Sequence, residues 1–335
     1  MSFRLKLNEP LQKCVRRISS EQFDIASREL AAIAIMPDGV HQTRKVLKRL
    51  RALLRLIGPS IGARRQKAHN VQLRDIGRML AGRREQAVLI ETLSALAARA
   101  EPEATAVIEG YRDRLRAPHL DLAGSLDSDL AGRVKARIAE QAKAFSKLKV
   151  KGKGFDAIEP GLVATYRSGR KAFHLAYEDP HDDNFHELRK MVQAHWRHIS
   201  LISRAWPEML DVRVAAARDL SLILGDDHDL SVLIAHVSAD TDADTSAKDV
   251  IIQAARSQQS ALRDRARPHL DRLFAERPAA FGARMRVYWR AAKRLKPLID
   301  AAVHGASADS GSPAAPAGGE LAAKMPASSL SKGAK

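Results

Sequence analysis

The segment from Val40 to Gly58, VHQTRKVLKRLRALLRLIG, carries six lysine and arginine side chains and no acidic one. Like charges this close repel one another, and a solvated helix surface normally relieves that repulsion with interspersed glutamate or aspartate. Guanidinium groups bind anion oxygens in pairs, and ammonium groups act as mobile point charges. The composition of this segment therefore predicts a binding site for a ligand with many negative charges.

A helical wheel separates the charged and apolar residues of this segment onto two faces. Within about 80° on the side of His41 lie Arg44, Lys45, Lys48, Arg51 and Arg55, with Arg49 at the other margin. The opposite arc holds Val46, Leu47, Leu50, Leu53, Leu54 and Ile57. We expect a helix that packs one face into a core and presents a continuous cationic face on the other.

A second segment repeats this pattern 145 residues further on. HELRKMVQAHWRHISLI, from His186, aligns without gaps on HQTRKVLKRLRALLRLI, from His41. Its basic side carries His186, Arg189, Lys190 and Arg197, whereas Gln193, Ala194, Trp196 and Ser200 replace Lys48, Arg49, Arg51 and Arg55. The second basic face therefore carries less positive charge than the first.

A looser match joins RDIGRMLAGRREQAVLI, from Arg74, to RDLSLILGDDHDLSVLI, from Arg218. We predict two pseudo-symmetric helical bundles, an internal repeat, around a basic central groove or pore.

The elements that position these residues are predicted to be helices throughout. Apolar residues are 45% of the 335 residues and aromatics only 4%, and apolar spacings of three and four dominate. We expect an all-α protein with helices at about 11–36, 40–57, 71–81, 84–100, 103–116, 127–149, 159–179, 183–205, 208–224, 229–238, 246–276 and 280–302. Residues 1–150 are predicted to form the first bundle, residues 151–303 the second, and residues 304–335 a disordered tail rich in Ala, Ser, Gly and Pro.

The formal net charge of +17 also favours a polyanionic partner. The excess is uneven: residues 1–150 hold 29 basic and 16 acidic residues, whereas the rest of the chain holds 27 and 23. Cys14 is the only cysteine, which excludes an intramolecular disulfide and a thiolate zinc site. The sequence shows neither an apolar signal segment nor a membrane span, so we expect a soluble, cytoplasmic protein without a cofactor.

At this point the residues support a family resemblance. VHQTRKVLKRLRALLRLI resembles the first signature of CHAD domains, the conserved-histidine α-helical domains, and HELRKMVQAHWRHISLI resembles the second. Further similarity lies in residues 15–30, 162–176, 224–233 and 272–289. The resemblance implies two helical bundles around a basic pore or groove, binding of long-chain inorganic polyphosphate, and association with polyphosphate granules.

The resemblance also implies which residues bind the polyphosphate. In the first signature they are His41, Arg44, Lys45, Lys48, Arg49, Arg51 and Arg55. In the second they are His186, Arg189, Lys190 and Arg197. Arg167, Arg170 and Lys171, on a neighbouring predicted helix, are added as further candidates. We expect His195 and His198, on the apolar side of their helix, to be core residues instead.

Two alternative functions remain open from the sequence. One alternative is a metal-dependent phosphohydrolase that acts on polyphosphate. Its candidate metal-binding residues are GDDHD at residues 225–229 and a second His-Asp pair at His181. Asp226 and Asp227 are also ordinary charges for a helix start after a glycine break, which is the interpretation we favour. HELRK is not a zinc-protease motif because its fifth residue is Lys190. The absence of a catalytic set favours a binding module over an enzyme, and no metal site is assigned.

The other alternative is a nucleic-acid-binding protein that uses the same basic groove. Charge alone does not distinguish phosphodiesters from phosphoanhydrides. Single-strand binding without sequence preference would require aromatic rings among the cations, and the basic face of residues 41–55 contains none. No recognisable reading element for duplex DNA is present. Polyphosphate is therefore the expected partner.

Overall fold

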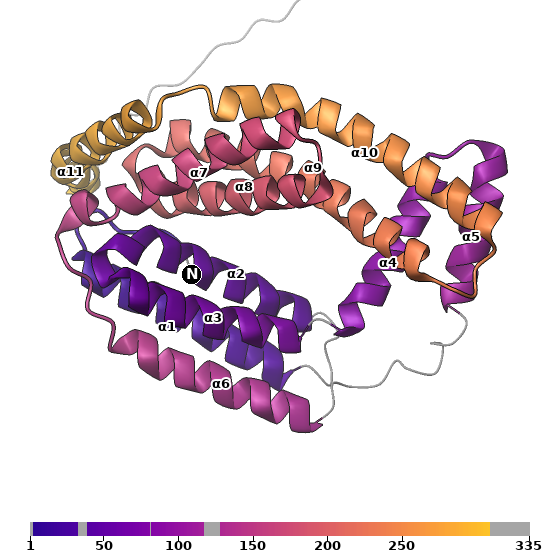
Figure 1. Cartoon of the computed structure of the whole chain (residues 1–335). Helices are drawn as coiled ribbons and strands as arrows, with labels where there is room; N and C mark the ends of the chain where they lie inside the picture. The colour runs from indigo at the N-terminus through magenta and orange to yellow at the C-terminus, as the bar shows by residue number, and fades with distance from the viewer. Residues whose placement is uncertain (1–2, 33–38, 81, 117–127, 309–335) are drawn as a thin grey trace, which may run out of the picture. The chain divides into compact units, whose positions relative to one another are not determined.

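The computed structural model describes residues 3–32, 39–80, 82–116 and 128–308. Within these ranges the chain forms eleven α-helices and two short 3-10 helices, without any strand, which confirms the all-α prediction (Figure 1). The α-helices are α1 Leu11–Ala31, α2 Gly39–Ile61, α3 Ala63–Met79, α4 Gly82–Ala97, α5 Pro102–Arg116, α6 Ser128–Ser146, α7 Glu159–Glu178, α8 Asp182–Ile202, α9 Pro207–Ala239, α10 Thr245–Leu273 and α11 Pro278–Ala308. The 3-10 helices are η2 Gly154–Ala157 and η3 Ser203–Ala205.

The chain divides into two compact units, Met1–Arg294 and Leu295–Lys335. Every predicted binding residue lies in the first unit. In the second unit, the described residues are helical as far as Ala308, and the rest of the predicted tail lies outside the described residues. The predicted division of the helices into two bundles at residue 150 stays a prediction.

Two groups of helices make up most of the first unit. Helix α2 packs against α1 and α3, and α6 packs against the same two helices. Helix α8 packs between α7 and α9, and α10 lies along α9. The pair α4 and α5 packs against α9 and α10, so a segment from the first half of the chain completes a core built by the second half (Figure 1).

Helix α2 connects the two groups because it also packs against α7 and α8. Its six predicted core residues are all buried, with exposed fractions of 3% or less. The crossing of α2 and α7 is tight: a Cβ added to Gly161 of α7 would lie 2.0 Å from the carbonyl oxygen of Leu56. Only glycine allows the two backbones to approach this closely.

Specific backbone geometry ends α2 and begins the next helix. Gly62 has a φ of 89°, which favours glycine, and its N–H donates to the Gly58 carbonyl at 2.9 Å. The predicted linker after residue 150 then packs against the same end of α2. The Lys151 N–H donates to the carbonyl of Ser60 at 2.9 Å, and the Ser60 hydroxyl donates to the carbonyl of Ala157 at 2.5 Å.

Two predicted helix boundaries are wrong. Helix α3 begins at Ala63, eight residues before the predicted start at residue 71. The sequence suggested that Gly225 ends one helix and that Asp226 and Asp227 start another, but α9 runs unbroken from Pro207 to Ala239. A glycine inside a helix lowers stability without necessarily ending the helix, because surrounding tertiary contacts override propensity. Gly225 is buried against the guanidinium of Arg189, which lies 3.9 Å from the position of an added Cβ. The two carboxylates are therefore mid-helix residues.

Candidate anion-binding site

The basic face of α2 is oriented by the burial of its apolar face. Three of its arginines are half-buried and bond to neutral atoms of three neighbouring helices. Arg49 donates to the Gln22 amide oxygen of α1 at 3.4 Å, Arg51 donates to Asn70 of α3 at 2.9 Å, and Arg55 approaches the Met191 sulfur of α8 at 3.1 Å. Among the described residues, no carboxylate forms an ion pair with these three arginines.

Helix α8 packs against α2 (Figure 1). The charge of Arg49 on α2 acts on Arg197 on α8. Besides the contact of Arg55 with Met191, the buried His198 ring donates from Nε2 to the Ala52 carbonyl at 2.9 Å. His195 and His198 are both fully buried, which confirms the prediction that they are core residues. Burial lowers the pKa of both rings, for His198 to about 3, so these side chains are neutral.

Arg197 of α8 is the least solvated cation of the site, with 8% of its surface exposed. Its Nη1 donates to the Gln193 carbonyl at 2.7 Å, and its guanidinium carbon lies 4.3 Å from the centroid of the Trp196 ring. Its Nε has no hydrogen-bond partner. Burial, together with the charges of Arg49 and Arg189, lowers the pKa of Arg197 to about 10. The site thus holds a desolvated cation beside two other arginines, and none of the three forms an ion pair with a described carboxylate.

Arg189 lies against α9. Burial lowers its pKa, and the carboxylates of Asp229, Asp226 and Asp227 oppose that shift. Its Nε is buried without a hydrogen-bond partner. The positive charge of Arg189 is therefore balanced only in part, by carboxylates at longer range than an ion pair.

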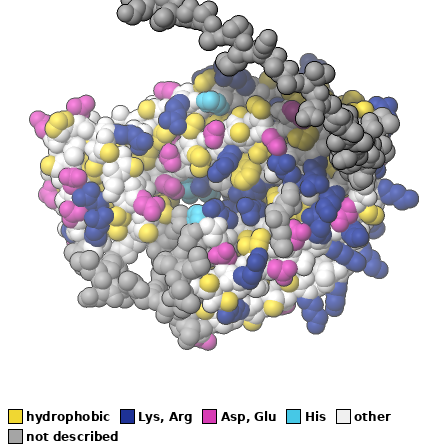
Figure 2. All heavy atoms as spheres, turned by 180° about the vertical axis from the view of Figure 1, so that it is seen from behind, with side chains coloured by type: hydrophobic (Ala, Val, Ile, Leu, Met, Phe, Trp, Pro, Cys, Tyr) yellow, Lys and Arg dark blue, Asp and Glu magenta, His cyan; other side chains and the backbone are white. Residues whose placement is uncertain are grey.

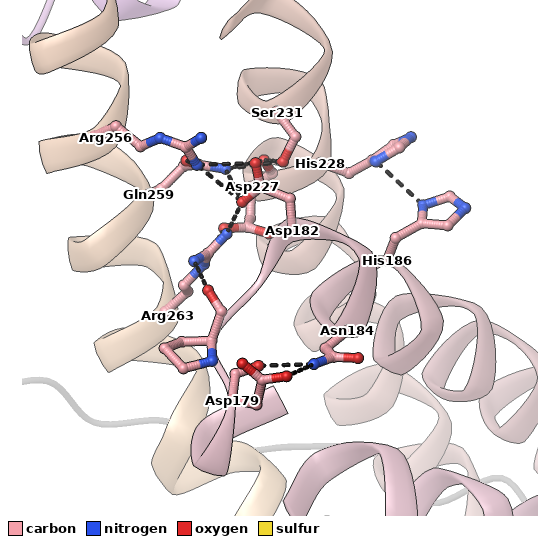
Figure 3. A network of polar contacts seen from close by, with 11 residues as sticks. Asp179, Asp182, Asn184, His186, Asp227, His228, Ser231, Arg256, Gln259 and Arg263 are labelled. Carbon is pink, nitrogen blue, oxygen red and sulfur yellow. Dashed lines mark hydrogen bonds and ion pairs between the residues drawn. The ribbon is translucent and has the colours of Figure 1, made fainter. Parts of the chain in front are cut away.

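His186, predicted as a direct ligand, faces His228 of α9 (Figure 3). The two Nδ1 atoms are 3.1 Å apart, and the ring centroids are 4.2 Å apart. Burial lowers the pKa of His228 to about 4, and the charges of Arg189, His186 and Lys48 add to the effect. Burial also lowers the pKa of His186, with Lys190 and Arg189 contributing. Both rings are neutral at pH 7, and one donates its Nδ1 hydrogen to the other.

The neighbouring Asp227 belongs to a separate polar network that joins α8, α9 and α10 (Figure 3). Asp227 is 2% exposed and accepts from Arg263 Nε at 2.7 Å, and Arg263 Nη2 donates to Asp182 at 2.6 Å. Gln259 donates to the Asp227 carbonyl and to Ser231. Within the described ranges, no group of three or more His, Cys, Asp or Glu side chains is placed to hold a metal ion.

The other predicted site residues vary in their surroundings. On α2, Arg44 donates to the Leu80 carbonyl at 3.3 Å, and exposed Lys45 contacts Gln42 at 3.5 Å. Exposed Lys190 pairs with Glu187. On α7, Arg170 donates to the carbonyls of residues 274–276 at the end of α10, a contact that joins two helices. Arg167 and Lys171 are exposed on the same helix.

Helix α3 contributes cations that the sequence analysis did not select. The charges of Arg74 and Arg78 lie close enough to lower the pKa of Arg51, after burial, which is the largest cause. Arg74 begins one of the repeated segments, so the repeat itself was the available signal. Lysine and arginine side chains gather around a hollow near the middle of one face of the molecule, with histidine at its edge (Figure 2).

Comparison with known proteins identifies the family. The family model described as "CHAD domain" matches residues 12–238. The chain belongs to the CHAD-domain family. The matched region contains α2 and α8, which carry the two CHAD signatures, and it confirms the resemblance seen in the sequence. No curated protein matches the chain.

Two solved structures share the fold of this chain. PptA from Streptomyces chartreusis matches with a TM-score of 0.53 at 13% identity, over 80% of this chain and 100% of that one. The CHAD domain from the plant Ricinus communis matches with a TM-score of 0.53 at 18% identity, over 81% of this chain and 94% of that one. Among the described helices, none has an apolar stretch sufficient to span a bilayer.

Proposed function

We propose that this CHAD domain binds long-chain inorganic polyphosphate, without cleaving it, between the basic faces of α2 and α8. The observation that carries the proposal is the burial of Arg197 beside Arg49 and Arg189 without an ion-pair partner. A desolvated cation without a counter-ion destabilises a folded protein, so an anionic ligand would supply the missing charge. Polyphosphate carries about one negative charge per phosphate, and its binding would release condensed counter-ions as nucleic acid binding does.

In this proposal the basic residues of both signatures contact the chain. The arginines bind phosphate oxygens in pairs, the lysines supply point charge, and His41 and His186 donate hydrogen bonds. The two groups of helices act as pseudo-symmetric bundles on either side of a central groove or pore. Arg167 and Lys171 extend the site along α7, and Arg170 does so only if its carbonyl contacts open. Association with polyphosphate granules in the cytoplasm would follow from this binding.

The non-catalytic part of the proposal rests on the surroundings of Asp227. Its carboxylate bonds to Arg263, which also bonds to Asp182. A carboxylate held in this way is a poor candidate for a metal ligand or general base. Incubation of the protein with polyphosphate and Mg²⁺ or Mn²⁺ should therefore release no phosphate above the buffer control. Phosphate release that is lost in an Asp227→Asn variant whose helical circular dichroism is unchanged would establish the phosphohydrolase alternative.

Nucleic acid is a weaker candidate for the same groove. Binding of single strands without sequence preference relies on aromatic rings that stack on bases. The aromatic ring within the second signature is Trp196, and the Arg197 guanidinium already covers one of its faces at 4.3 Å. A ring occupied by an arginine on one face is a poor stacking platform.

A charge-reversal experiment tests the proposed site. Lys45 and Lys48 are exposed on the basic face of α2, and Lys135 and Lys143 are also exposed, on α6. Lys45→Glu with Lys48→Glu should weaken polyphosphate binding at least about tenfold, because two attractive charges become repulsive. Lys135→Glu with Lys143→Glu makes the same change of net charge and should leave affinity nearly unchanged. Equal losses in both double variants would mean that binding depends on net charge alone.

A further inference from the structure

A cavity of about 380 Å³ lies where α2, α3 and α7 meet. Its cationic lining residues are Arg51, Arg55 and Lys67, and its neutral polar ones are Gln66, Asn70, Thr165 and Ser168. Among the described residues that line it, none is acidic. The volume is near the lower end of the range for small-ligand sites, about 300–1,000 Å³. The lining therefore fits a compact anion.

The hydroxyl of Thr165 has no hydrogen-bond partner although the residue is only 2% exposed. Buried polar groups in folded proteins are almost always hydrogen-bonded. Thr165 lines the cavity, and we assign its unpartnered O–H as the donor to an anion held there. An orphaned donor inside a cationic cavity is an observation independent of the basic face of α2.

The N-terminus of α3 adds favourable electrostatics to this cavity. Ala63, the first residue of α3, lines the cavity, and its N-cap Gly62 offers no side-chain acceptor. No acidic residue lies in the first turn of this 17-residue helix. The first N–H groups of a helix lack partners within the helix, and the helix dipole makes this end attractive to anions.

The two arginines of the cavity keep their positive charge largely uncompensated. Asn70 holds Arg51 Nε at 2.9 Å and thereby orients the guanidinium. Burial lowers the pKa of Arg51, and Arg55 makes the largest contribution among the neighbouring charges. Burial lowers the pKa of Arg55, and the charge of Glu187, whose ion-pair partner is Lys190, opposes this shift. An anion in the cavity would relieve this repulsion.

One wall of the cavity is closed to a continuing chain. Gly161 lines the cavity, and at this residue α7 touches the backbone of α2 so closely that an added Cβ would lie 2.0 Å from the Leu56 oxygen. A long polyphosphate cannot pass between two helices in backbone contact. The cavity therefore offers a chain no exit on the side of Gly161.

We infer that this cavity binds a doubly charged terminal phosphate, either the end of a polyphosphate chain or one end of a short oligophosphate. A terminal phosphate group carries about −1.5 to −2 at neutral pH, against about −1 for an internal one, and so matches a site with three cations. This inference deepens the proposed function and rests on it for the identity of the long chain. Such a site would make the affinity of the protein for polyphosphate depend on the chain ends as well as on the chain length.

The test compares short polyphosphate with the same polyphosphate amidated at both terminal phosphates, using the full chain and titration calorimetry. The wild-type protein should bind the free-ended form about tenfold more tightly, the size expected for one charge-assisted contact. Thr165→Val combined with Lys67→Met should reduce this ratio to about one. Equal affinity of the wild-type protein for both forms, or an unchanged ratio in the double variant, would overturn the inference.

A matched control separates the cavity from general effects on folding. Thr43 is also fully buried with an unpartnered hydroxyl, but it lies on α2 outside the cavity. Thr43→Val should keep the tenfold preference for free-ended polyphosphate, and loss of this preference in Thr43→Val would overturn the inference.

Pyrophosphate alone is the second probe. If pyrophosphate binds in a way that depends on Thr165 and long chains do not bind, the proposed function is refuted and the cavity site is established. If long chains bind without a preference for free ends, the proposed function stands and the cavity inference is refuted.

Discussion

His186 and His228 place their Nδ1 atoms 3.1 Å apart although they belong to different helices and lie 42 residues apart. When both rings are neutral, one hydrogen lies between these two nitrogens, so the pair resists protonation. Arg189 and Lys190 add to that resistance for His186, and Arg189 and Lys48 add to it for His228. The opposing carboxylates are Glu187 and Asp183 for the first ring and Asp182 for the second.

The first prediction is that polyphosphate binding takes up protons. A polyanion beside the pair stabilises the protonated rings, so their pKa values should rise on binding and affinity should increase as pH falls from 7 toward 5. Calorimetry in buffers of different ionisation enthalpy measures the proton uptake. His228→Gln should reduce it, and a binding enthalpy independent of the buffer would contradict the prediction.

The same pair makes the ligand-free protein sensitive to acid. The pKa of His228 falls from 6.5 to about 4 on folding, so between these pH values the unfolded chain binds more protons than the folded protein. The free energy of unfolding therefore decreases as pH falls through this window. His195 and His198, also buried and neutral, act in the same direction. Polyphosphate should restore part of the lost stability, which a melting series with and without ligand measures.

Arg197 should show opposite effects on stability and binding. Arg197→Met removes a buried, unpaired cation while it keeps the aliphatic part of the side chain, so we expect the free energy of unfolding to increase by about 1–2 kcal/mol. Polyphosphate affinity should fall about tenfold. Denaturant unfolding and calorimetry measure the two effects. Lys190→Met, which changes an exposed ion pair, should alter stability by less than about 0.5 kcal/mol. A destabilised Arg197→Met protein with unchanged affinity would show that this arginine is structural.

Asp227 should matter for folding rather than for chemistry. Asp227→Asn leaves Arg263 without its buried partner and should lower the free energy of unfolding by about 3 kcal/mol. The neighbouring Asp226 is exposed, and Asp226→Asn should change stability by less than about 0.5 kcal/mol. Denaturant unfolding of both variants distinguishes the two residues. Similar stabilities would mean that the network of Asp227, Arg263 and Asp182 contributes little to the fold.

The sequence predicted most of the helices because the spacing of apolar residues can be read from one sequence without any structure. It predicted the two faces of α2 because the apolar half is unambiguous, and Val46, Leu50 and Leu53 are all buried. It failed at Gly225, where a glycine beside two aspartates imitates a helix start. Only tertiary packing against Arg189 shows why the helix continues there.

Partners from distant segments could not be predicted. The meeting of His186 with His228 depends on how α8 crosses α9, and nothing in the repeat indicates it. The cavity at Thr165 likewise combines three helices, and its closed wall depends on a single glycine, Gly161. Side chains that bond to a backbone carbonyl, as Arg170 does, resemble binding residues in sequence because the same charge serves both purposes.

Gly161 offers a direct check of the crossing between α2 and α7. Gly161→Ala places a methyl group 2.0 Å from the Leu56 oxygen, so the helices must separate and the free energy of unfolding should fall by about 3 kcal/mol. Gly132 of α6 has no atom within 4 Å of an added Cβ. Gly132→Ala should stabilise the protein by about 0.5–1 kcal/mol. Comparable melting temperatures of the two variants would show that the crossing is looser than described.

Competition calorimetry tests the central claim most directly. The full chain is titrated with long-chain polyphosphate, with RNA and with duplex DNA of matched total charge, each at a low and at a physiological salt concentration. The account predicts that polyphosphate binds most tightly at physiological salt and displaces both nucleic acids. Tighter binding of RNA or DNA under the same conditions would contradict it.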